Sequence, residues 1–354
     1  MHVLVTGGAG FIGSHIVEWH LNRGDRVHVV DDLSTGRREN IAWAANNPDF
    51  HFEQVDLSRW DGMGRTCQWA DRIYHMAAIV GVKKVLQDPI RVVAVNIRTT
   101  DFLLQAIQRT GWNPEIVIAS SSEVYVHNPG EDFGEQQDFI WRFGHELRWT
   151  YAASKFAEEY LAFLHHRLYG RKIIAARLFN VIGPRQVGTY GMVVPTFVRQ
   201  AVLGDDITVY GDGTQRRTFC DVRDTVQILV RLAANPAAYG QVVNVGAAQE
   251  VGIRALAGLV RERAQSRSKI AFVPYAEAYG EGFEEVFRRR PVLALQEQLT
   301  RYRPQRSLIE TIDELIAIER NKATELYRAA SRSDAAGPVF PSAQTGLRGS
   351  IRRA

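Results

Sequence analysis

The feature that most restricts how this chain can fold is a glycine-rich loop that follows a short apolar strand near the amino terminus. The strand is expected over Val3 to Thr6, and the loop reads Thr-Gly-Gly-Ala-Gly-Phe-Ile-Gly from Thr6 to Gly13. In this setting Gly7 permits a tight turn, Gly10 lets backbone N–H groups approach a pyrophosphate at a helix N-terminus, and Gly13 permits close packing of the helix on the strand. The loop therefore predicts the first strand-turn-helix unit of a dinucleotide-binding fold.

Short apolar strands alternate with amphipathic helical segments through the first half of the chain. One helix is expected from about Gly13 to Arg23 and stops at Gly24, and another runs to about Tyr169 and stops at Gly170. Further strands are expected at Arg26 to Val30, Arg72 to His75, Ile116 to Ser120 and Ile173 to Arg177. This alternation predicts an α/β fold with a doubly wound parallel sheet of the Rossmann type.

The pattern becomes less regular after Asn180. Helices and strands are still expected at Val194 to Leu203, Ile207 to Tyr210, from about Val222, and at Val242 to Val245. We predict a Rossmann domain over residues 1–178, to which residues 220–250 return, and a smaller α/β substrate-binding part over residues 179–329. Residues 330–354, which are rich in small residues and arginine and have no apolar periodicity, are expected to form a disordered tail.

Charge and cysteine content exclude several classes of function. The formal net charge is +4, but residues 331–354 hold four arginines and one aspartate, so the tail alone carries +3 and the basic balance does not indicate nucleic-acid binding. Cys67 and Cys220 lie far apart, without a Cys-x-x-Cys pair or histidine cluster, so no disulfide framework and no metal site is expected. A chain without a leader-like start or an apolar run of about 18 residues is expected to be cytoplasmic and to bind no membrane.

The residue that ends the second strand indicates the cofactor. Asp31 stands where an acid would bind the ribose hydroxyls of an adenosine, which favours NAD over NADP. Arg37 and Arg38 follow past Gly36 and offer an alternative site for a 2′-phosphate, although a solvated charge pair is the simpler interpretation. NAD is therefore the predicted cofactor.

Tyr151 and Lys155 are separated by one helical turn in the sequence Trp-Thr-Tyr-Ala-Ala-Ser-Lys, so both side chains lie on one face of a helix. A tyrosine is a poor base at neutral pH because its pKa is near 10. A cation at about 4 Å contributes roughly 4 kcal/mol at an effective dielectric constant of 20, or about 3 pKa units. This pair predicts redox chemistry in which Lys155 helps to make the phenolate of Tyr151 available.

These motifs, taken together, resemble a known family. The shared motifs are the Gly-x-x-Gly-x-x-Gly loop, Asp31-Asp32-Leu-Ser-Thr-Gly36, Asp56-Leu57, His75-Met-Ala-Ala78, Ser120-Ser-Ser-Glu-Val-Tyr125, Tyr151-x-x-x-Lys155 and Arg177-Leu-Phe-Asn-Val-Ile-Gly-Pro-Arg185. Over roughly residues 1–315 the chain resembles the extended short-chain dehydrogenase/reductases that modify nucleotide sugars. The resemblance implies bound NAD, a nucleotide-sugar substrate with UDP favoured, and a homodimer whose interface includes the tyrosine helix. Phe156, Tyr160 and Phe163 belong either to that interface or to the core.

The resemblance also implies roles for individual residues. Members of this family oxidise a sugar hydroxyl, usually at C4; Tyr151 would be the base, Lys155 would bind the nicotinamide ribose, and Ser121 would hydrogen-bond the reacting oxygen. Glu123 is typical of dehydratases and decarboxylases rather than of C4-epimerases, and Ser122 replaces the aspartate that precedes it in many 4,6-dehydratases. The pair Ser122-Glu123 is similar to that of UDP-glucuronate decarboxylases, and GDP-mannose 4,6-dehydratases also have it.

Two arginines of the second half also match the decarboxylase pattern. Arg217 matches an arginine that meets the diphosphate, and Arg289 matches a decarboxylase arginine near the sugar carboxylate, although residues 288–290 also fit a solvated loop. Val126 and Asp221 depart from the family pattern, because a glycine and an aromatic residue or histidine are common there.

The predicted site is larger than this catalytic core. Further cofactor contacts implied by the resemblance are Gly7, Gly10, Phe11, Ile12, Gly13, Asp31, Asp32, Ser34, Thr35, Gly36, Asp56, Leu57, Ala77, Ala78 and Asn96. Further substrate contacts are Lys83, Ser122, Asn180, Arg185, Val194, Tyr210 and Arg217. Decarboxylation of UDP-glucuronate, through a 4-keto sugar that is then reduced or released, is the preferred hypothesis. A 4-epimerase, a 4,6-dehydratase and, more remotely, a non-catalytic NAD-sensing protein stay open.

Overall fold

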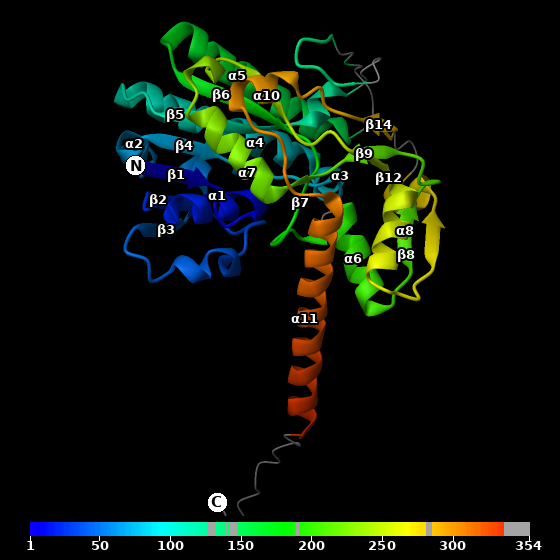
Figure 1. The fold of residues 1–354 in the computed structure, drawn as a ribbon. Coiled ribbons are helices and arrows are strands. Elements are labelled where there is room, and N and C mark those ends of the chain that lie inside the picture. The colour runs from blue at the N-terminus through cyan, green and yellow to red at the C-terminus, as the bar shows by residue number, and fades with distance from the viewer. Residues whose placement is uncertain (127–131, 139–140, 142–146, 189–190, 281–284, 336–354) are drawn as a thin grey trace, which may run out of the picture.

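The structure is a computed structural model that describes the chain except for residues 127–131, 139–140, 142–146, 189–190, 281–284 and 336–354. The described residues form a large parallel sheet with helices on both faces and a smaller part beside its carboxyl edge (Figure 1). None of the helices in these residues is long and apolar enough to cross a membrane.

Seven strands form the large sheet in the order β11-β6-β5-β4-β1-β2-β3, and all neighbours are parallel. The strands are β1 His2–Thr6, β2 Arg26–Asp31, β3 Phe50–Gln54, β4 Arg72–His75, β5 Glu115–Ser121, β6 Lys172–Leu178 and β11 Val242–Val245. The chain runs outward from β1 to β3, then returns to β4 on the other side, so the carboxyl ends of β1 and β4 flank a crevice. This arrangement confirms the predicted doubly wound sheet.

Alternate residues of the strands face two different helical layers. Val3, Val5 and Val29 pack with α1 (Phe11–Leu21), α7 (Val222–Ala233) and α10 (Ala294–Thr300). Leu4, Ile73 and Ile116 pack on the other face with α2 (Met63–Trp69), α4 (Pro89–Thr110) and α5 (Trp149–Tyr169). Because both faces are covered, the strands are apolar on both sides.

The five strands expected in the first half are present, and β11 joins the sheet beside β6. The edge strand β3 was missed. Its sequence Phe-His-Phe-Glu-Gln alternates apolar and polar residues, which is the pattern of a half-exposed strand, but it is shorter and more polar than the central strands.

The smaller part has its own core and three short sheets. Strand β8 (Ile207–Tyr210) pairs with β13 (Ile270–Val273), β7 (Val181–Ile182) pairs with β10 (Cys220–Asp221), and β9 (Arg216–Thr218) lies between β12 (Glu250–Gly252) and β14 (Arg288–Arg289). Three helices cover these strands: α6 Val193–Leu203, α8 Ile253–Arg263 and α11 Leu308–Ala335. The short helix α9 (Tyr275–Tyr279) follows β13. Another short helix, α3 (Val82–Gln87), follows β4 and packs against α4.

Helix α11 leaves the body of the protein and continues away from it (Figure 1). It extends to Ala335, so the predicted tail does not begin at residue 330. The remainder of that predicted tail, residues 336–354, lies outside the described residues.

The two departures from the family pattern have different structural settings. Val126 follows the 3-10 turn Ser122–Tyr125 with φ +44°, a left-handed conformation that a β-branched residue rarely adopts. Asp221 caps α7 by accepting the Arg223 backbone N–H at 2.8 Å, and it also accepts the Thr311 hydroxyl at 2.8 Å. Asp221 therefore joins α7 to α11.

Candidate functional site

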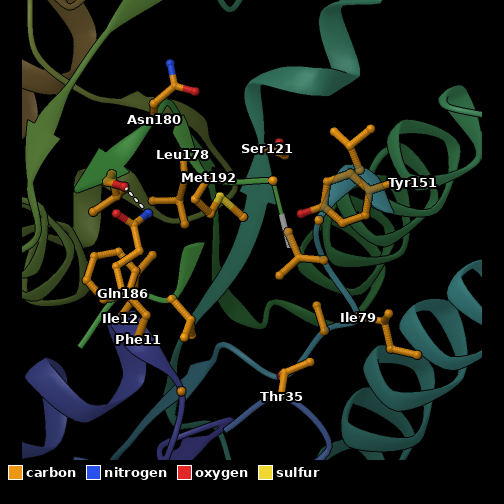
Figure 2. A pocket seen from close by; sticks show the side chains of 18 of the residues that line it. Phe11, Ile12, Thr35, Ile79, Ser121, Tyr151, Leu178, Asn180, Gln186 and Met192 are labelled. Atoms are coloured by element: carbon orange, nitrogen blue, oxygen red, sulfur yellow. Dashed lines mark hydrogen bonds between the residues drawn. The ribbon is translucent and has the colours of Figure 1, made fainter. Parts of the chain in front are cut away.

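A single cavity of about 1160 Å³ lies along the carboxyl ends of the parallel strands and continues into the smaller part. Figure 2 looks into it, with Phe11 and Ile12 on one side, Tyr151 and Ser121 on another, and Asn180 beyond them. Crevices at this edge of a doubly wound sheet are the usual ligand sites of such folds. The volume exceeds that of most small-molecule pockets, so the cavity can hold a dinucleotide together with a second ligand.

The glycine loop forms the floor of the cavity. Gly7 has φ +70°, and a Cβ there would lie 2.7 Å from the Ala77 backbone nitrogen. A Cβ on Gly13 would lie 2.2 Å from the Gly7 carbonyl oxygen, so helix and turn can approach only without side chains. No side chain caps the N-terminus of α1, and its first N–H groups are available to an anion in the cavity.

Asp31 ends β2 with a buried carboxylate. It accepts the backbone N–H groups of Ala9 at 3.0 Å and Leu33 at 2.9 Å. Burial is the largest influence and raises the pKa of Asp31 despite these hydrogen bonds. Arg38 turns away, because it stacks over Phe52 and donates to Gln54 at 2.8 Å. An acid at the strand end suits a ribose diol, and Arg38 is directed elsewhere, whereas Arg37 lines the cavity.

Most of the predicted cofactor contacts line the cavity. The lining includes Gly7, Gly10, Phe11, Ile12, Gly13, Asp31, Asp32, Ser34, Thr35, Asp56, Leu57, Ala77, Ala78, Tyr151 and Lys155. Gly36 instead packs against the Asp31 carboxylate, where a Cβ would lie 2.7 Å from its oxygen. Asn96 is buried in α4, bonds both to the backbone of Ile79 and to the Ser154 hydroxyl, and thereby fixes the loop after β4.

Tyr151 sits in the first turn of α5 with its ring largely buried and its hydroxyl facing the cavity beside Ser121 (Figure 2). Burial raises the pKa of Tyr151 well above its ordinary value, the charges of Glu123 and Glu158 raise it further, and a hydrogen bond with Ser121 opposes them. The phenol is therefore protonated at neutral pH in this state of the protein.

Lys155 does not have the effect on Tyr151 that the sequence suggested. Its Nζ is 2% exposed and donates to Glu158 Oε2 at 3.0 Å, and Glu158 also accepts the Thr100 hydroxyl at 2.9 Å. Burial raises the pKa of Glu158, against the pull of Lys155. The carboxylate at Glu158 neutralises the ammonium, which explains why the pair on one helix face does not lower the pKa of the tyrosine.

A second buried ion pair supports the same wall from behind. Glu159 accepts two hydrogen bonds from Arg177, at 2.9 and 2.7 Å, and the Ser120 hydroxyl at 2.5 Å. The guanidinium of Arg177 also lies 4.7 Å from the ring centre of Tyr125, whose hydroxyl donates to Asn244 at 2.7 Å. This network ties α5 to β5, β6 and β11 next to Ser121, and bidentate pairs of this kind are geometrically rigid.

Glu123 and Arg289 face each other in the cavity. Arg289 Nη1 lies 3.3 Å from Glu123 Oε1, with side-chain exposures of 6% and 17%. Burial alone would raise the pKa of Glu123, but the charges of Arg289, Arg148 and Arg217 together lower it below its usual value. The Nε of Arg289 is buried and has no hydrogen-bond partner among the described residues. Arg289 also lines the cavity, so its guanidinium is placed to meet an anionic ligand there.

Arg217 is beside Arg289 because β9 and β14 pair in parallel with these residues in register. Arg217 Nη2 donates to Glu285 Oε1 at 2.9 Å, and Arg148 Nη1 reaches the same oxygen at 3.2 Å. Burial, followed by repulsion from Arg289, lowers the pKa of Arg217 to about 10. Three arginines thus meet two glutamates, Glu123 and Glu285, and this end of the cavity favours an anionic ligand.

The remaining predicted substrate contacts divide into two groups. Ser122, Asn180, Val194 and Tyr210 line the cavity with Arg217 and Arg289. Arg185, at φ +69°, pairs with Glu18 of α1 and does not line it. Lys83 belongs to α3, but its side chain lies outside the described part of the structure.

Sequence reasoning missed Arg148, Glu158 and Glu285. Arg148 could have been noticed because it lies three residues before Tyr151, one helical turn away on the same face. Glu158 has the same spacing after Lys155. Glu285 carries no local signal, because it reaches the site from a loop of the smaller part.

The described residues fit a nicotinamide dinucleotide. Uncapped N–H groups suit a pyrophosphate, Asp31 suits the adenosine ribose, and Lys155 and Tyr151 lie at the far end of the same cavity. The phosphate loop, the acid and the Tyr-Lys pair therefore form one continuous surface that can hold such a ligand.

Comparison with known proteins relates the chain to one family along most of its length. The model of the NAD dependent epimerase/dehydratase family matches residues 3–246. UDP-N-acetyl-alpha-D-glucosaminuronate decarboxylase of Bacillus cytotoxicus is 34% identical over 315 residues, which cover 88% of this chain and 96% of the relative. UDP-glucuronic acid decarboxylase 1 of Arabidopsis thaliana is 32% identical over 324 residues, which cover 91% of this chain and 70% of the relative.

Solved structures give the same fold. The dTDP-glucose 4,6-dehydratase DesIV of Streptomyces venezuelae, solved with NAD, matches with a TM-score of 0.82 and 27% identity over 92% of this chain and 98% of that one. The UDP-glucuronic acid 4-epimerase of Bacillus cereus, in complex with UDP-glucuronic acid and NAD, matches with a TM-score of 0.80 and 26% identity over 92% of this chain and the whole of that one.

Proposed function

Because the chain belongs to the NAD-dependent epimerase/dehydratase family, we propose that it decarboxylates a UDP-hexuronate through a 4-keto intermediate, with UDP-glucuronate as the first substrate to test. The products would be CO2 and a UDP-4-keto-pentose, or UDP-xylose after reduction. The observation that carries this proposal is Arg289, whose guanidinium lines the cavity and faces the ionised Glu123.

The arginine-rich end of the cavity supports a substrate with two separate anionic groups. Arg289 lies close to the carboxylate of Glu123. The Ser121 hydroxyl accepts the backbone N–H of Glu123 and is hydrogen-bonded to the hydroxyl of Tyr151. Arg217 lies one strand further from Glu123, next to Tyr210 and the smaller part. We assign the sugar carboxylate to Arg289 and the diphosphate to Arg217, because planar guanidinium groups bind both anions in bidentate fashion.

The first step needs a hydride acceptor and a base at the sugar C4. NAD, when bound, accepts the hydride that leaves C4. Tyr151 takes the proton of the C4 hydroxyl, Ser121 hydrogen-bonds the same oxygen, and Lys155 is placed to bind the nicotinamide ribose. Since the phenol is protonated in this state of the protein, proton release from Tyr151 must accompany ligand binding.

The second step follows from the chemistry of the ketone. Once C4 is a carbonyl, the carboxylate at C6 belongs to a β-keto acid, so the C5–C6 bond can break, with its electron pair passing to the C4 oxygen as CO2 leaves. The protonated Tyr151 and Ser121 donate hydrogen bonds to the resulting enolate. C5 then takes up a proton from Tyr151, which received one in the first step, because the ionised Glu123 carries none to give.

Incubating the purified protein with NAD and UDP-glucuronate labelled at C6 tests this proposal. We expect labelled CO2 and a nucleotide sugar lighter by one CO2, and UDP-N-acetylglucosaminuronate should be assayed in parallel because a relative is named for it. Unlabelled UDP-glucose is the control, since it has no carboxylate to lose. Retention of all label on both uronates would reject decarboxylation.

A 4-epimerase is the second candidate, because the structure of a UDP-glucuronic acid 4-epimerase matches 92% of this chain. Both activities share the oxidation at C4 and differ in the fate of the carboxylate. The same assay separates them, because epimerisation would leave the mass unchanged and invert C4.

We also propose that the chain forms a homodimer through α4 and α5. The α5 residues Phe156, Tyr160 and Phe163 are 37%, 57% and 40% exposed, so they do not belong to the core of one chain. Their rings form a continuous contact, with centroids 6.3 and 6.1 Å apart. Exposed apolar patches of this kind mark interaction sites. Tyr160→Glu should convert a dimer to a monomer in light scattering, whereas Tyr169→Glu at the helix end should not; a wild-type monomer would contradict the proposal.

A further inference from the structure

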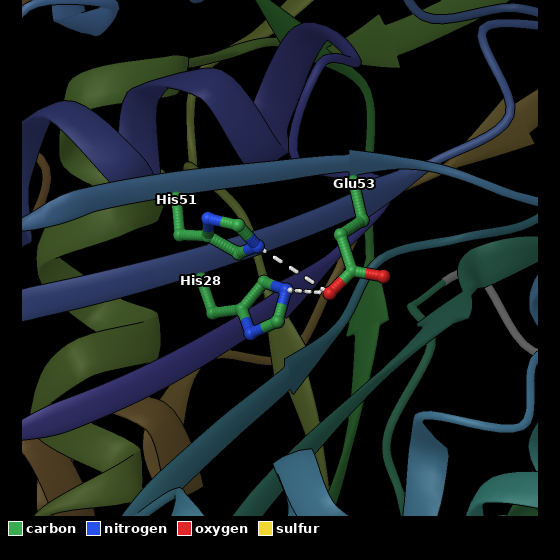
Figure 3. Close-up of side chains that lie close together, drawn as sticks. All are labelled: His28, His51 and Glu53. Carbon is green, nitrogen blue, oxygen red and sulfur yellow. Dashed lines mark hydrogen bonds and ion pairs between the residues drawn. The ribbon is translucent and has the colours of Figure 1, made fainter.

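A group of two histidines and one glutamate lies on strands β2 and β3, on the α2 face of the sheet and away from the cavity described above (Figure 3). His28 and His51 are opposite each other in the parallel register, and Glu53 follows His51 by two residues on the same face of β3. The nitrogen and oxygen atoms that the three side chains can offer lie within 4.8 Å of one another.

From this geometry we propose that His28, His51 and Glu53 form a binding site for a divalent transition-metal ion, with Zn²⁺ preferred. The Nε2 atoms of His28 and His51 lie 3.2 and 3.4 Å from the same oxygen, Glu53 Oε1. Ligands about 2.0–2.1 Å from a tetrahedral zinc are separated by roughly 3.3 Å, which matches the distance of each histidine nitrogen from the glutamate oxygen. Two imidazoles and one carboxylate suit Zn²⁺, Ni²⁺ or Cu²⁺, whereas Mg²⁺ and Ca²⁺ prefer oxygen ligands.

The surroundings of His28 support a ligand role. Its Nε2 is buried and points at Glu53 Oε1, the same oxygen that His51 Nε2 approaches. Its ring packs edge-on against Trp60 and Trp69, with centroids 5.7 and 6.0 Å away, and these contacts fix its orientation. A preorganised imidazole loses little freedom when it binds a metal.

The exposure of the three side chains provides an entry path. His28 is 12% exposed, Glu53 is 34% exposed and His51 is 65% exposed. An ion can therefore arrive from solvent, bind to three protein ligands and keep water in the fourth position. None of the three side chains lines the cavity described above, so the inferred role is to join β2 and the edge strand β3 rather than to catalyse a reaction.

Both strands continue toward the cofactor end of the cavity. Three residues after His28, β2 ends at Asp31, and β3 leads into Asp56 and Leu57, which line the cavity. A metal bridge would thus stiffen β2 and β3, the two strands that lead to the adenosine end of the cavity. The proposed metal site does not depend on the proposed reaction.

Titration of untagged, chelator-treated full-length protein with Zn²⁺ tests the site. We expect one equivalent to bind in calorimetry and to raise the melting temperature, Co²⁺ to show the visible absorption of tetrahedral coordination, and Mg²⁺ to have no effect. Because even outer-sphere partners of metal sites change affinity by about 10–100-fold, His51→Ala and Glu53→Gln should each weaken binding at least about tenfold. His51 is exposed, so His51→Ala should fold without metal.

Glu39→Gln is the matched control, because Glu39 is an exposed glutamate of the same region outside the group, and this variant should bind like wild type. A wild-type protein that takes up no zinc at one equivalent would overturn the proposal. Equal affinity of His51→Ala, Glu53→Gln and Glu39→Gln would overturn it as well, because the ion would then be bound elsewhere.

Discussion

Two walls of the same cavity differ in how far their buried charges are neutralised by partners of opposite sign. On the wall formed by α5, β5 and β6, buried charges meet partners of opposite sign, with Lys155 on Glu158 and Arg177 on Glu159. On the wall formed by β9 and β14, Arg217 and Arg289 lie side by side, and with Arg148 they exceed the nearby glutamates. The first wall is complete without a ligand, and the second is not.

This difference separates the two tasks of the site. A wall with matched charges holds Tyr151 and Ser121 in place whatever sugar is bound, which suits an oxidation that the whole family shares. A wall with surplus positive charge gains stability only from an anion, which suits the recognition of a carboxylate and a diphosphate. Under the proposed function, the second wall would decide which nucleotide sugar is bound.

Removing the hydroxyl of Tyr151 should have the largest effect on activity. Tyr151→Phe removes the only described group beside Ser121 that can transfer the proton, and general acid–base catalysis is worth about 10²–10⁴-fold. We expect kcat to fall by about that factor with little change in the melting temperature. Tyr169→Phe on the exposed end of α5 is the control and should keep full activity. Normal turnover of Tyr151→Phe would mean that another residue is the base.

Removing one charge of a buried ion pair in the wall formed by α5, β5 and β6 should mainly lower the free energy of unfolding. Glu159→Gln leaves the guanidinium of Arg177 buried without its counter-ion, and such losses cost about 3–5 kcal/mol. The free energy of unfolding from urea titration measures this. Glu297→Gln removes a surface pair with Arg303 and should change it by less than about 1 kcal/mol. Similar values for the two variants would show that burial of the Arg177 pair does not matter.

Weakening the arginine wall should change substrate choice without unfolding the protein. Arg289→Lys keeps the charge but loses the planar fork, and hydrogen bonds to charged groups are worth about 1.5–3 kcal/mol, or roughly 10–100-fold. We expect kcat/KM on a UDP-hexuronate to fall by about 10–100-fold. The neighbouring Arg290 pairs with Asp132 outside the cavity, so Arg290→Lys should retain activity. Equal losses in both variants would argue against a carboxylate at Arg289.

The smallest expected effect is on the pH dependence. The charge of Glu158 raises the pKa of Tyr151, after burial and Glu123, so Glu158→Gln should lower that pKa. More phenolate then forms at a given pH, and the rising limb of kcat/KM should move to lower pH. The profile of Glu325→Gln, on an exposed turn of α11, should match wild type. A rising limb that moves to higher pH would show that Glu158 helps Lys155 to lower the pKa of Tyr151 instead of raising that pKa.

The sequence contained enough to predict the central sheet and the family. Strands buried on both faces are short apolar runs, and the glycine loop adopts its turn through its own backbone, so both leave a local pattern. β3 was missed because an edge strand buries only one face. The doubly wound sheet and the family predicted from the motifs are both confirmed.

The candidate site was less predictable where it depends on tertiary pairing. Spacing brought Tyr151 and Lys155 to one helix face, but nothing in that spacing reveals that burial and Glu158 outweigh the lysine. Arg185 shares its motif with a substrate contact, yet its side chain pairs with Glu18 of α1. The position of Arg289 beside Arg217 follows from the register of β14 on β9, which joins segments distant in the sequence.

That register also has a consequence for how the protein reaches its native state. Two like charges must be brought together when β14 docks on β9, and β14 emerges from the ribosome long after the sheet strands β1 to β6. Docking of β14 on β9 therefore has to overcome repulsion between Arg217 and Arg289. A nucleotide sugar that binds only the form with β14 docked would stabilise that form. Raising its concentration would shift the equilibrium between undocked and docked β14 toward the docked state.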